Sequence, residues 1–135
     1  MDEQKIILAR YRLDKAREEL ESAKQSFDKN LLRVSLSNSY YSVFHSVRIL
    51  LALEGIDSKT HKGVAHLFNV HFIKNNLLPL RMNEILSDSF EMRLDSDYED
   101  FYIASREEAK EQIDNAEFFL NEIVSFVSKH YNIEL

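Results

Sequence analysis

Residues 38–48, the most informative stretch of the chain, read Asn-Ser-Tyr-Tyr-Ser-Val-Phe-His-Ser-Val-Arg. Successive residues of an α-helix are turned by about 100°, and at this angle the large apolar side chains of the region share one broad face. They are Leu32, Leu36, Tyr40, Val43, Phe44, Val47, Leu50 and Leu51. An apolar face this wide predicts a deeply buried helix over residues 31–54.

A narrow polar stripe runs along the other side of the same helix. It consists of Asn38, Tyr41, His45 and Arg48, at i, i+3, i+7 and i+10. Hydrophobic packing does not explain the alignment of these four polar groups on a core helix. Either they form hydrogen bonds with one another and with neighbouring helices, or they face a ligand. Beside them lies a stripe of small residues, Ser35, Ser39, Ser42 and Ser46. Small side chains let another helix approach closely, either within the chain or across a dimer.

Apolar residues recur at helical spacing in four further segments. These predict helices over residues 3–27, 61–75, 80–94 and 105–129. Capping residues fit these limits, because Asn30, Thr60 and Ser105 precede predicted helices and Gly55 follows one. Residues 95–104 have no helical period and are expected to form an ordered loop with aromatic anchors.

The turn-forming residues limit the fold class. The chain holds two glycines and one proline in 135 residues, whereas an all-β or α/β fold would need more turn residues. No internal repeat or linker divides the chain, and short connections favour antiparallel neighbours. We therefore predict an all-α fold, a single domain over residues 1–135 built as a five-helix, mostly antiparallel up-and-down bundle.

Composition and charge narrow the functional classes. The absence of cysteine excludes disulfides, thiolate metal sites and a cysteine nucleophile, and it fits a reducing cytoplasm. No apolar run approaches the roughly 20 residues that span a bilayer, so we expect a cytoplasmic protein without membrane contact. The net charge of −6 is unevenly spread, since residues 1–81 carry 13 basic against 9 acidic residues and residues 82–135 carry 4 against 14. Such a split fits either an anion-tolerant central surface or two halves that complement each other.

The histidines at positions 61, 66 and 71 do not form a metal site by spacing. Steps of five residues turn each about 140° from the last, and the HExxH pattern is missing, so no metal or cofactor is predicted. His61 follows the Thr60 cap and precedes Lys62, which makes this helix start a candidate anion site or a plain surface cap.

Arg93, Asp97 and Tyr98 form a second cluster, in the acidic segment. We expect an Arg93–Asp97 tie that orders the loop, with Tyr98 packed beneath it as structural support. Asp95 or Asp97 is also the expected partner of Arg48.

Three pieces of the chain together resemble the HEPN family (higher eukaryotes and prokaryotes nucleotide-binding). The first is the 38–48 stretch with the Leu50-Leu51 run after it, which is similar to the family's Tyr-Tyr-x-x-Phe-His helix. The second is Gly55, then Thr60-His61-x-Gly63, then Phe68 and Phe72-Ile-Lys74. The third is Arg93-x-x-x-Asp97-Tyr98 with the closing helix that starts near Ser105. The resemblance covers roughly residues 5–128.

The resemblance implies a five-helix bundle that forms a homodimer and works beside a minimal nucleotidyltransferase as a toxin–antitoxin pair. Several HEPN proteins are metal-independent ribonucleases whose signature is an arginine followed five to seven residues later by a histidine. None of the eight arginines of this chain has a histidine at that distance. Self-sufficient RNA cleavage is therefore not expected, whereas nucleotide or RNA binding is compatible with this departure.

Our leading hypothesis is a site for nucleotide or RNA phosphates on the second and third helices. Arg48 and His61 are the predicted phosphate contacts, and Asn38, Tyr41 and His45 are predicted to order them. One alternative is a pure dimerisation or protein-interaction module that uses the polar stripe as its interface. Another is a weak metal-independent ribonuclease that uses His45 with Arg48.

Overall fold

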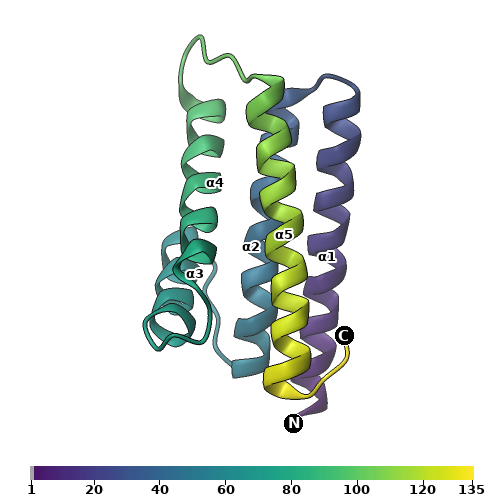
Figure 1. Cartoon of the computed structure of the whole chain (residues 1–135), viewed down its shortest axis with the longest axis vertical. Helices are drawn as coiled ribbons and strands as arrows, with labels where there is room; N and C mark the ends of the chain where they lie inside the picture. The colour runs from purple at the N-terminus through teal and green to yellow at the C-terminus, as the bar shows by residue number, and fades with distance from the viewer. Residues whose placement is uncertain (1) are drawn as a thin grey trace.

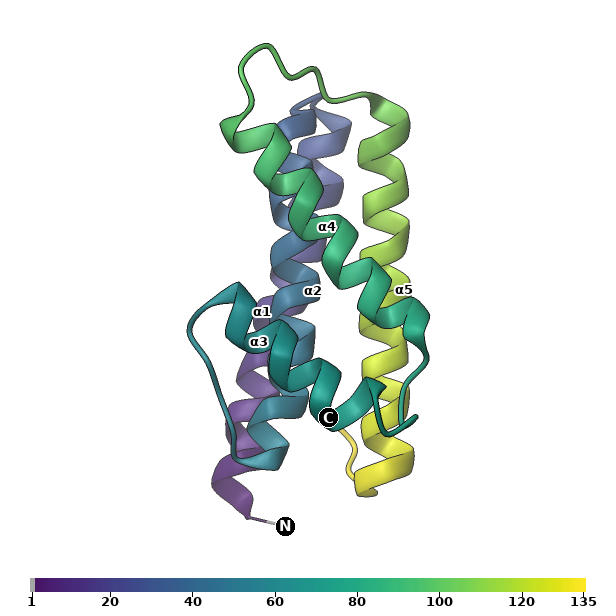
Figure 2. The ribbon, with the colours of Figure 1, turned by 90° about the vertical axis from the view of Figure 1, so that its left-hand side faces the viewer.

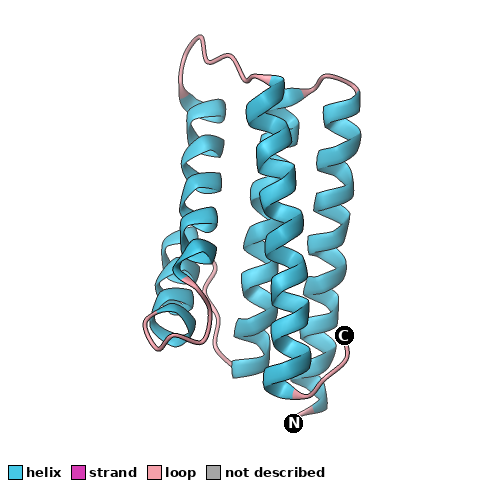
Figure 3. Cartoon of the chain, in the orientation of Figure 1, coloured by secondary structure: helices cyan, strands magenta, loops and turns pink. Residues whose placement is uncertain are grey.

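The computed structural model describes residues 2–135. Over that range every element of regular secondary structure is a helix, and loops connect the helices (Figures 1 and 3). The elements are α1 (Glu3–Asp28), α2 (Leu32–Glu54), α3 (His61–Phe68), the π-helical turn η1 (Asn69–Ile73), α4 (Leu80–Tyr98) and α5 (Arg106–Tyr131). The predicted all-α class with five helices is confirmed. Within these residues, no helix combines the length and the hydropathy needed to cross a membrane.

The four long helices alternate in direction, up along α1 and α4 and down along α2 and α5 (Figure 1). Turning the molecule shows α4 running diagonally across the bundle, with the short α3 near its N-terminal end (Figure 2). Helix α2 is the central element, because it contacts each of the other α-helices. Its predicted apolar face is buried, as expected for the helix that organises the core.

The small residues of α2 allow α1 to pack closely against it. Ser42 Oγ donates a hydrogen bond to the Ala16 carbonyl, and Ser35 Oγ donates one to the Ala23 carbonyl, both at 2.8 Å. Both alanines are fully buried, so nothing larger than a methyl group separates the two helices there. For Ser35 and Ser42, the neighbour is thus a helix of the same chain.

Most of the predicted helix ends are confirmed. Gly55 has φ +72°, the left-handed conformation in which glycine ends a helix without a Cβ penalty. Thr60 Oγ1 accepts from the Gly63 N–H at 3.0 Å, and Ser105 Oγ accepts from the Glu108 N–H at the same distance. The prediction for Asn30 is wrong, because Leu31 is the N-cap residue and Asn30 instead accepts a hydrogen bond from Arg106.

Helix α4 is longer than predicted and continues to Tyr98, so residues 95–98 are helical rather than part of the loop. The last carbonyls of a helix lack a partner within the helix and are satisfied from outside. Here the guanidinium of Arg33, on α2, donates from Nε to the Ser96 carbonyl at 3.1 Å. This partner lies 63 residues away, so local sequence pattern could not reveal it.

Candidate functional site

Between residues 38 and 48, the polar stripe of α2 lies along a partly exposed strip of a helix that is otherwise buried there. Asn38, Tyr41, His45 and Arg48 are each partly exposed, while the residues between them are buried. The predicted helix phase is therefore correct. The four groups do not converge on one point, however, because Asn38 contacts α1, Tyr41 contacts α4 and Arg48 contacts the loop after α2.

Asn38 turns towards α1. Its Nδ2 donates to Glu19 Oε2 at 3.1 Å, and its Oδ1 accepts from Ser26 Oγ at 3.3 Å. Both ends of the amide are thus engaged within the chain, so Asn38 positions α2 against α1 instead of ordering the other three residues.

Arg48 is held by Asp57, in the loop after α2, and not by Asp95 or Asp97. Its Nε and Nη2 donate to the two carboxylate oxygens of Asp57, at 3.2 and 2.8 Å. Arg12 of α1 joins the same carboxylate at 2.8 Å and also donates to the Arg48 carbonyl at 2.7 Å. Burial opposes ionisation of Asp57, but the hydrogen bonds from Arg48 and from the Ser58 N–H outweigh it and lower the Asp57 pKa.

His45 lies on the stripe between Tyr41 and Arg48. Its ring stacks on that of Tyr41 at a centroid distance of 6.3 Å, and its Nδ1 is buried with no hydrogen-bond partner among the described residues. Burial, reinforced by the positive charges of Lys15, Arg48 and Arg12, lowers the pKa of His45 to about 4. The imidazole is therefore neutral at pH 7 and surrounded by cations.

His61 belongs to a separate cluster, centred on Tyr40. The buried Tyr40 hydroxyl and His61 Nδ1 are 2.9 Å apart, and the imidazole stacks on the Phe90 ring at 3.6 Å with an interplanar angle of 6°. Burial, followed by the charge of Arg93, lowers the pKa of His61. These contacts fix the ring and leave Nε2 as its remaining polar atom.

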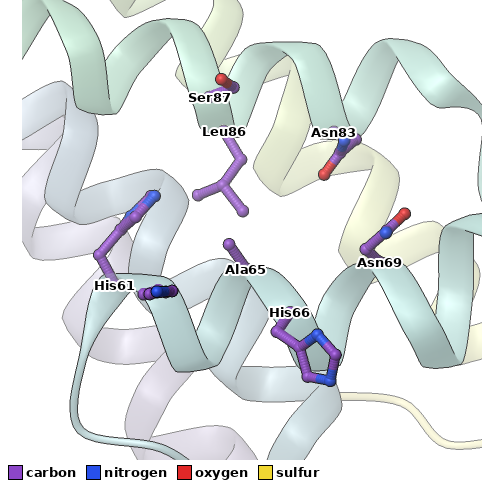
Figure 4. A pocket seen from close by; sticks show the side chains of 8 residues that line it. His61, Ala65, His66, Asn69, Asn83, Leu86 and Ser87 are labelled. Atoms are coloured by element: carbon purple, nitrogen blue, oxygen red, sulfur yellow. The ribbon is translucent and has the colours of Figure 1, made fainter.

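A groove of about 310 Å³ opens beside His61, between α3 and α4 (Figure 4). Its polar lining comes from His61, Lys62, His66, Asn69, Asn83 and Ser87, and its apolar floor from Ala65 and Leu86. None of these side chains is a carboxylate, although the chain as a whole is acidic. The groove is therefore suited to a polar or anionic ligand.

Arg93 of α4 connects the two clusters. Its guanidinium carbon lies 5.1 Å from the Tyr41 ring centroid and 5.5 Å from that of Tyr40, within cation–π distance of both. Its Nε is 3.3 Å from Asp97 Oδ2, so the expected Arg93–Asp97 tie is present. Tyr98, by contrast, is 71% exposed and is not packed beneath this pair.

Sequence reasoning missed several residues that complete this region: Arg12, Lys15, Tyr40, Asp57 and Phe90. Arg12 gave the clearest available signal, because it interrupts the apolar row of α1 between Ala9 and Leu13. A charged residue in a buried row is expected to have a specific partner. No group of three or more His, Asp or Glu residues that could hold a metal ion occurs in the described part of the chain.

Comparisons with known proteins identify the family to which this chain is similar. The model of the HEPN domain matches residues 9–127. Two proteins of Methanocaldococcus jannaschii with the name "Putative toxin" are 29% identical over 129 residues and 32% identical over 108 residues. These matches cover 91% and 80% of this chain, and 88% and 80% of the relatives. A UPF0332 protein of Thermotoga maritima is 30% identical over 127 residues, covering 94% of this chain and 96% of the relative.

Proposed function

The chain belongs to the HEPN domain family, and from this premise we propose that it binds the phosphates of a nucleotide or an RNA along the α2 stripe. Of the stripe residues, Tyr41, His45 and Arg48 would contact the ligand, and Arg93 extends this surface towards His61. The protein would act as the toxin-like member of a pair with a minimal nucleotidyltransferase.

The observation that carries this proposal is the gathering of cations around a half-exposed aromatic strip. Arg12, Lys15, Arg48 and Arg93 surround Tyr41 and His45, in a chain whose net charge is −6. Three carboxylates, those of Glu19, Asp57 and Asp97, offset part of this charge, so four cations face three anions along the strip. Basic residues interleaved with aromatic rings are the combination that binds a phosphate backbone and stacks on bases.

The contacts of each residue assign its role. Asp57 uses Nε and Nη2 of Arg48, so Nη1 is the atom that would donate to a phosphate oxygen. His61 is neutral at pH 7 and would contribute a hydrogen bond rather than a charge. Arg93, which we expected to be only structural support, is added to the phosphate contacts because its guanidinium lies between the stripe and His61.

The role in a toxin–antitoxin pair is supported by the family and by the names of the two relatives from Methanocaldococcus jannaschii. The ribonuclease alternative receives less support from the site. With a pKa of about 4, His45 is neutral at pH 7 and cannot donate a proton efficiently to a leaving group.

Isothermal calorimetry with ATP and with a short single-stranded RNA tests the phosphate site. The informative variant is Lys15→Gln, since Lys15 lies near His45 without holding Asp57, and the matched control is Arg81→Gln on the exposed side of α4. We expect Lys15→Gln to weaken RNA binding roughly tenfold and to reduce the slope of log K against log salt by about 0.7. Arg81→Gln should leave both values unchanged.

Two results would contradict the proposal. One is the absence of saturable binding of either ligand by the wild-type protein. The other is an equal loss of affinity in Lys15→Gln and Arg81→Gln, which would indicate non-specific attraction instead of a site.

A further inference from the structure

The groove between α3 and α4 contains two asparagine amides that the fold leaves unused. Of the four partly buried asparagines in residues 2–135, Asn38 and Asn115 are bonded to other side chains of the chain. Asn69 and Asn83, which line the groove, have no side-chain hydrogen bond among the described residues. Figure 4 shows their side chains in the space between the two helices. Polar groups half withdrawn from water are normally bonded, so these two amides are available to a ligand.

The position of Asn69 depends on the π-helical turn η1, which begins at this residue. The Lys74 N–H donates to the Asn69 carbonyl at 2.8 Å, which is the five-residue spacing of a π-helix. Such wide turns are rare and are found frequently at functional sites. The irregular backbone and one of the two unused amides therefore coincide at the groove.

His61 supplies a hydrogen-bond donor at the other end of the groove (Figure 4). The buried Tyr40 hydroxyl lies 2.9 Å from His61 Nδ1, and burial raises the pKa of Tyr40, so the phenol keeps its proton. The hydroxyl donates this proton to Nδ1, which leaves the neutral imidazole with its own proton on Nε2. The groove thus has an N–H donor of fixed tautomer at one end and two amides at the other.

The lining of the groove matches the edge of a nucleobase. A site built for an oxyanion alone needs only donors, whereas each amide also offers a carbonyl oxygen as an acceptor. Donors and acceptors lie side by side on the edges of the bases. Ala65 and Leu86 form an apolar floor that would contact the flat face of a base. The volume of about 310 Å³ is at the lower end of the range for small-molecule sites, so it suits a single base.

The same lining favours adenine over the other bases. An asparagine pairs with adenine through two hydrogen bonds, in which its Oδ1 accepts from the N6 amino group and its Nδ2 donates to N7. The amino group of cytosine is read by a carboxylate, and no carboxylate lines the groove. Guanine is read by arginine or lysine, and the only such residue in the lining is the exposed Lys62.

The groove is continuous with the proposed phosphate surface. The Arg93 guanidinium carbon lies 5.5 Å from the Tyr40 ring centroid, and the Tyr40 hydroxyl holds His61, which lines the groove. The charge of Arg93 also acts on His61. A base held in the groove would therefore direct its phosphate towards Arg93, which extends the α2 stripe in this direction.

We propose that the groove between α3 and α4 is a base-binding subsite that selects adenine, with the amides of Asn69 and Asn83 reading the edge of the base. Base selection in this form rests on the proposed phosphate site. The stripe supplies affinity for any nucleotide or RNA, and the groove supplies the choice among bases.

Fluorescence anisotropy with short RNAs that contain only adenine, only uracil or only cytosine tests this selection at one salt concentration. The variant Asn83→Leu removes one donor and one acceptor at similar size, and Asn121→Leu makes the same change at an exposed position of α5. We expect the wild type and Asn121→Leu to bind the adenine RNA at least about fivefold more tightly than the other two. Asn83→Leu should bind all three equally, with its affinity for the uracil RNA unchanged within about twofold.

A second measurement separates the groove from the phosphate surface. Adenosine carries no phosphate, so in two-dimensional NMR spectra of isotope-labelled protein it should shift the side-chain amide signals of Asn69 and Asn83 but not that of Asn121. Uridine should shift none of them. Comparing AMP with the adenine RNA in the same titrations distinguishes a free nucleotide from a strand as the source of the base.

Three results would overturn base selection and leave the phosphate site standing. They are equal affinity of the wild type for the three RNAs, an adenine preference that survives in Asn83→Leu, and equal shifts of the groove amides by uridine and adenosine. The absence of saturable binding of any RNA would contradict the phosphate site instead. The adenosine titration would then judge the groove by itself, and unmoved Asn69 and Asn83 signals would overturn it.

Discussion

Ser39 and Ser42 of α2 are both fully buried, but their hydroxyl groups have different surroundings. Ser42 Oγ donates to the Ala16 carbonyl, whereas Ser39 Oγ finds no hydrogen-bond partner among the residues described. A buried hydroxyl without a partner costs free energy, and a satisfied one contributes about 1 kcal/mol. The same substitution is therefore expected to have opposite effects at two positions less than one turn apart.

We predict that Ser42→Ala lowers the free energy of unfolding by about 1 kcal/mol and that Ser39→Ala leaves it unchanged or raises it by up to about 1 kcal/mol. Urea denaturation followed by circular dichroism measures both values, and each variant serves as the control of the other. Equal destabilisation by the two substitutions would show that the hydroxyl contacts of α2 differ from those described.

The sequence alone predicted the positions of the stripe residues on α2 but not the partner of Arg48. The helix phase that groups Tyr41, His45 and Arg48 follows from periodicity alone, and the structure places all three on one partly exposed strip. The partner of Arg48 does not follow from periodicity, because Asp57 reaches it only after Gly55 has turned the chain back. The predicted partners, Asp95 and Asp97, were chosen for their charge, which carries no information about distance.

At the scale of elements, the start of α3 depends on one glycine. A Cβ added to Gly63 would lie 1.9 Å from Ser58 Oγ and 2.7 Å from Ser58 Cβ, so the Ser58 side chain would have to move. Ser58 also lies beside the Thr60 cap, with Thr60 N–H donating to Ser58 Oγ at 3.4 Å. This close approach links the loop after α2 to the helix that carries His61.

We predict that Gly63→Ala destabilises the protein by about 1 kcal/mol, because the clash outweighs the higher helix propensity of alanine. Adding Ser58→Gly removes both clashing atoms, so the double variant should regain at least the stability lost by Gly63→Ala. Thermal or urea unfolding of the two single variants and the double variant forms a complete mutant cycle. Additive effects, with no rescue, would contradict the described contact.

Element boundaries were predictable where the capping groups are local. Thr60 and Ser105 cap helices within three residues of their own position, and both were identified from the sequence. The end of α4 depends instead on Arg33, which acts across 63 residues. This boundary was predicted four residues too early for that reason.

At the scale of the whole molecule, the all-α class followed from helical periodicity and from the shortage of glycine and proline. The convergence of Arg93 and His61 around Tyr40 could not be predicted from the same pattern, because these residues lie on three different helices, α4, α3 and α2. A motif defined by the spacing of an arginine and a histidine along the chain does not detect a pair assembled from two helices. Such a pair is brought together only by the packing of the two helices against each other.

Stability of the whole molecule should fall on mild acidification, because His45 and His61 are held neutral in the folded state. Burial lowers the pKa of His45 to about 4, and the pKa of His61 is also lowered. In the unfolded chain a histidine titrates near 6.5, so between pH 6.5 and 4 the unfolded state binds more protons than the folded state. Under this linkage, stability is present above pH 6.5 and is lost as the pH falls. The contribution of Asp57 to stability changes little between pH 7 and 5. Because the pKa of Asp57 is lowered in the folded state, this contribution is lost only at lower pH.

We therefore predict that, between pH 7 and pH 5, the free energy of unfolding falls by about 1 kcal/mol more in the wild-type protein than in the variant His45→Gln. This value is smaller than the full pKa difference would give, because the ring is partly exposed and solvent screens its charge. Urea denaturation at pH 7, 6 and 5, at one fixed protein concentration, measures the difference. His71→Gln, which replaces an exposed ring, is the matched control and should keep the wild-type slope. If His45→Gln and the wild type lost stability in parallel, the folded protein would have to accept a proton on His45 at pH 5, and the ring would be less buried than described.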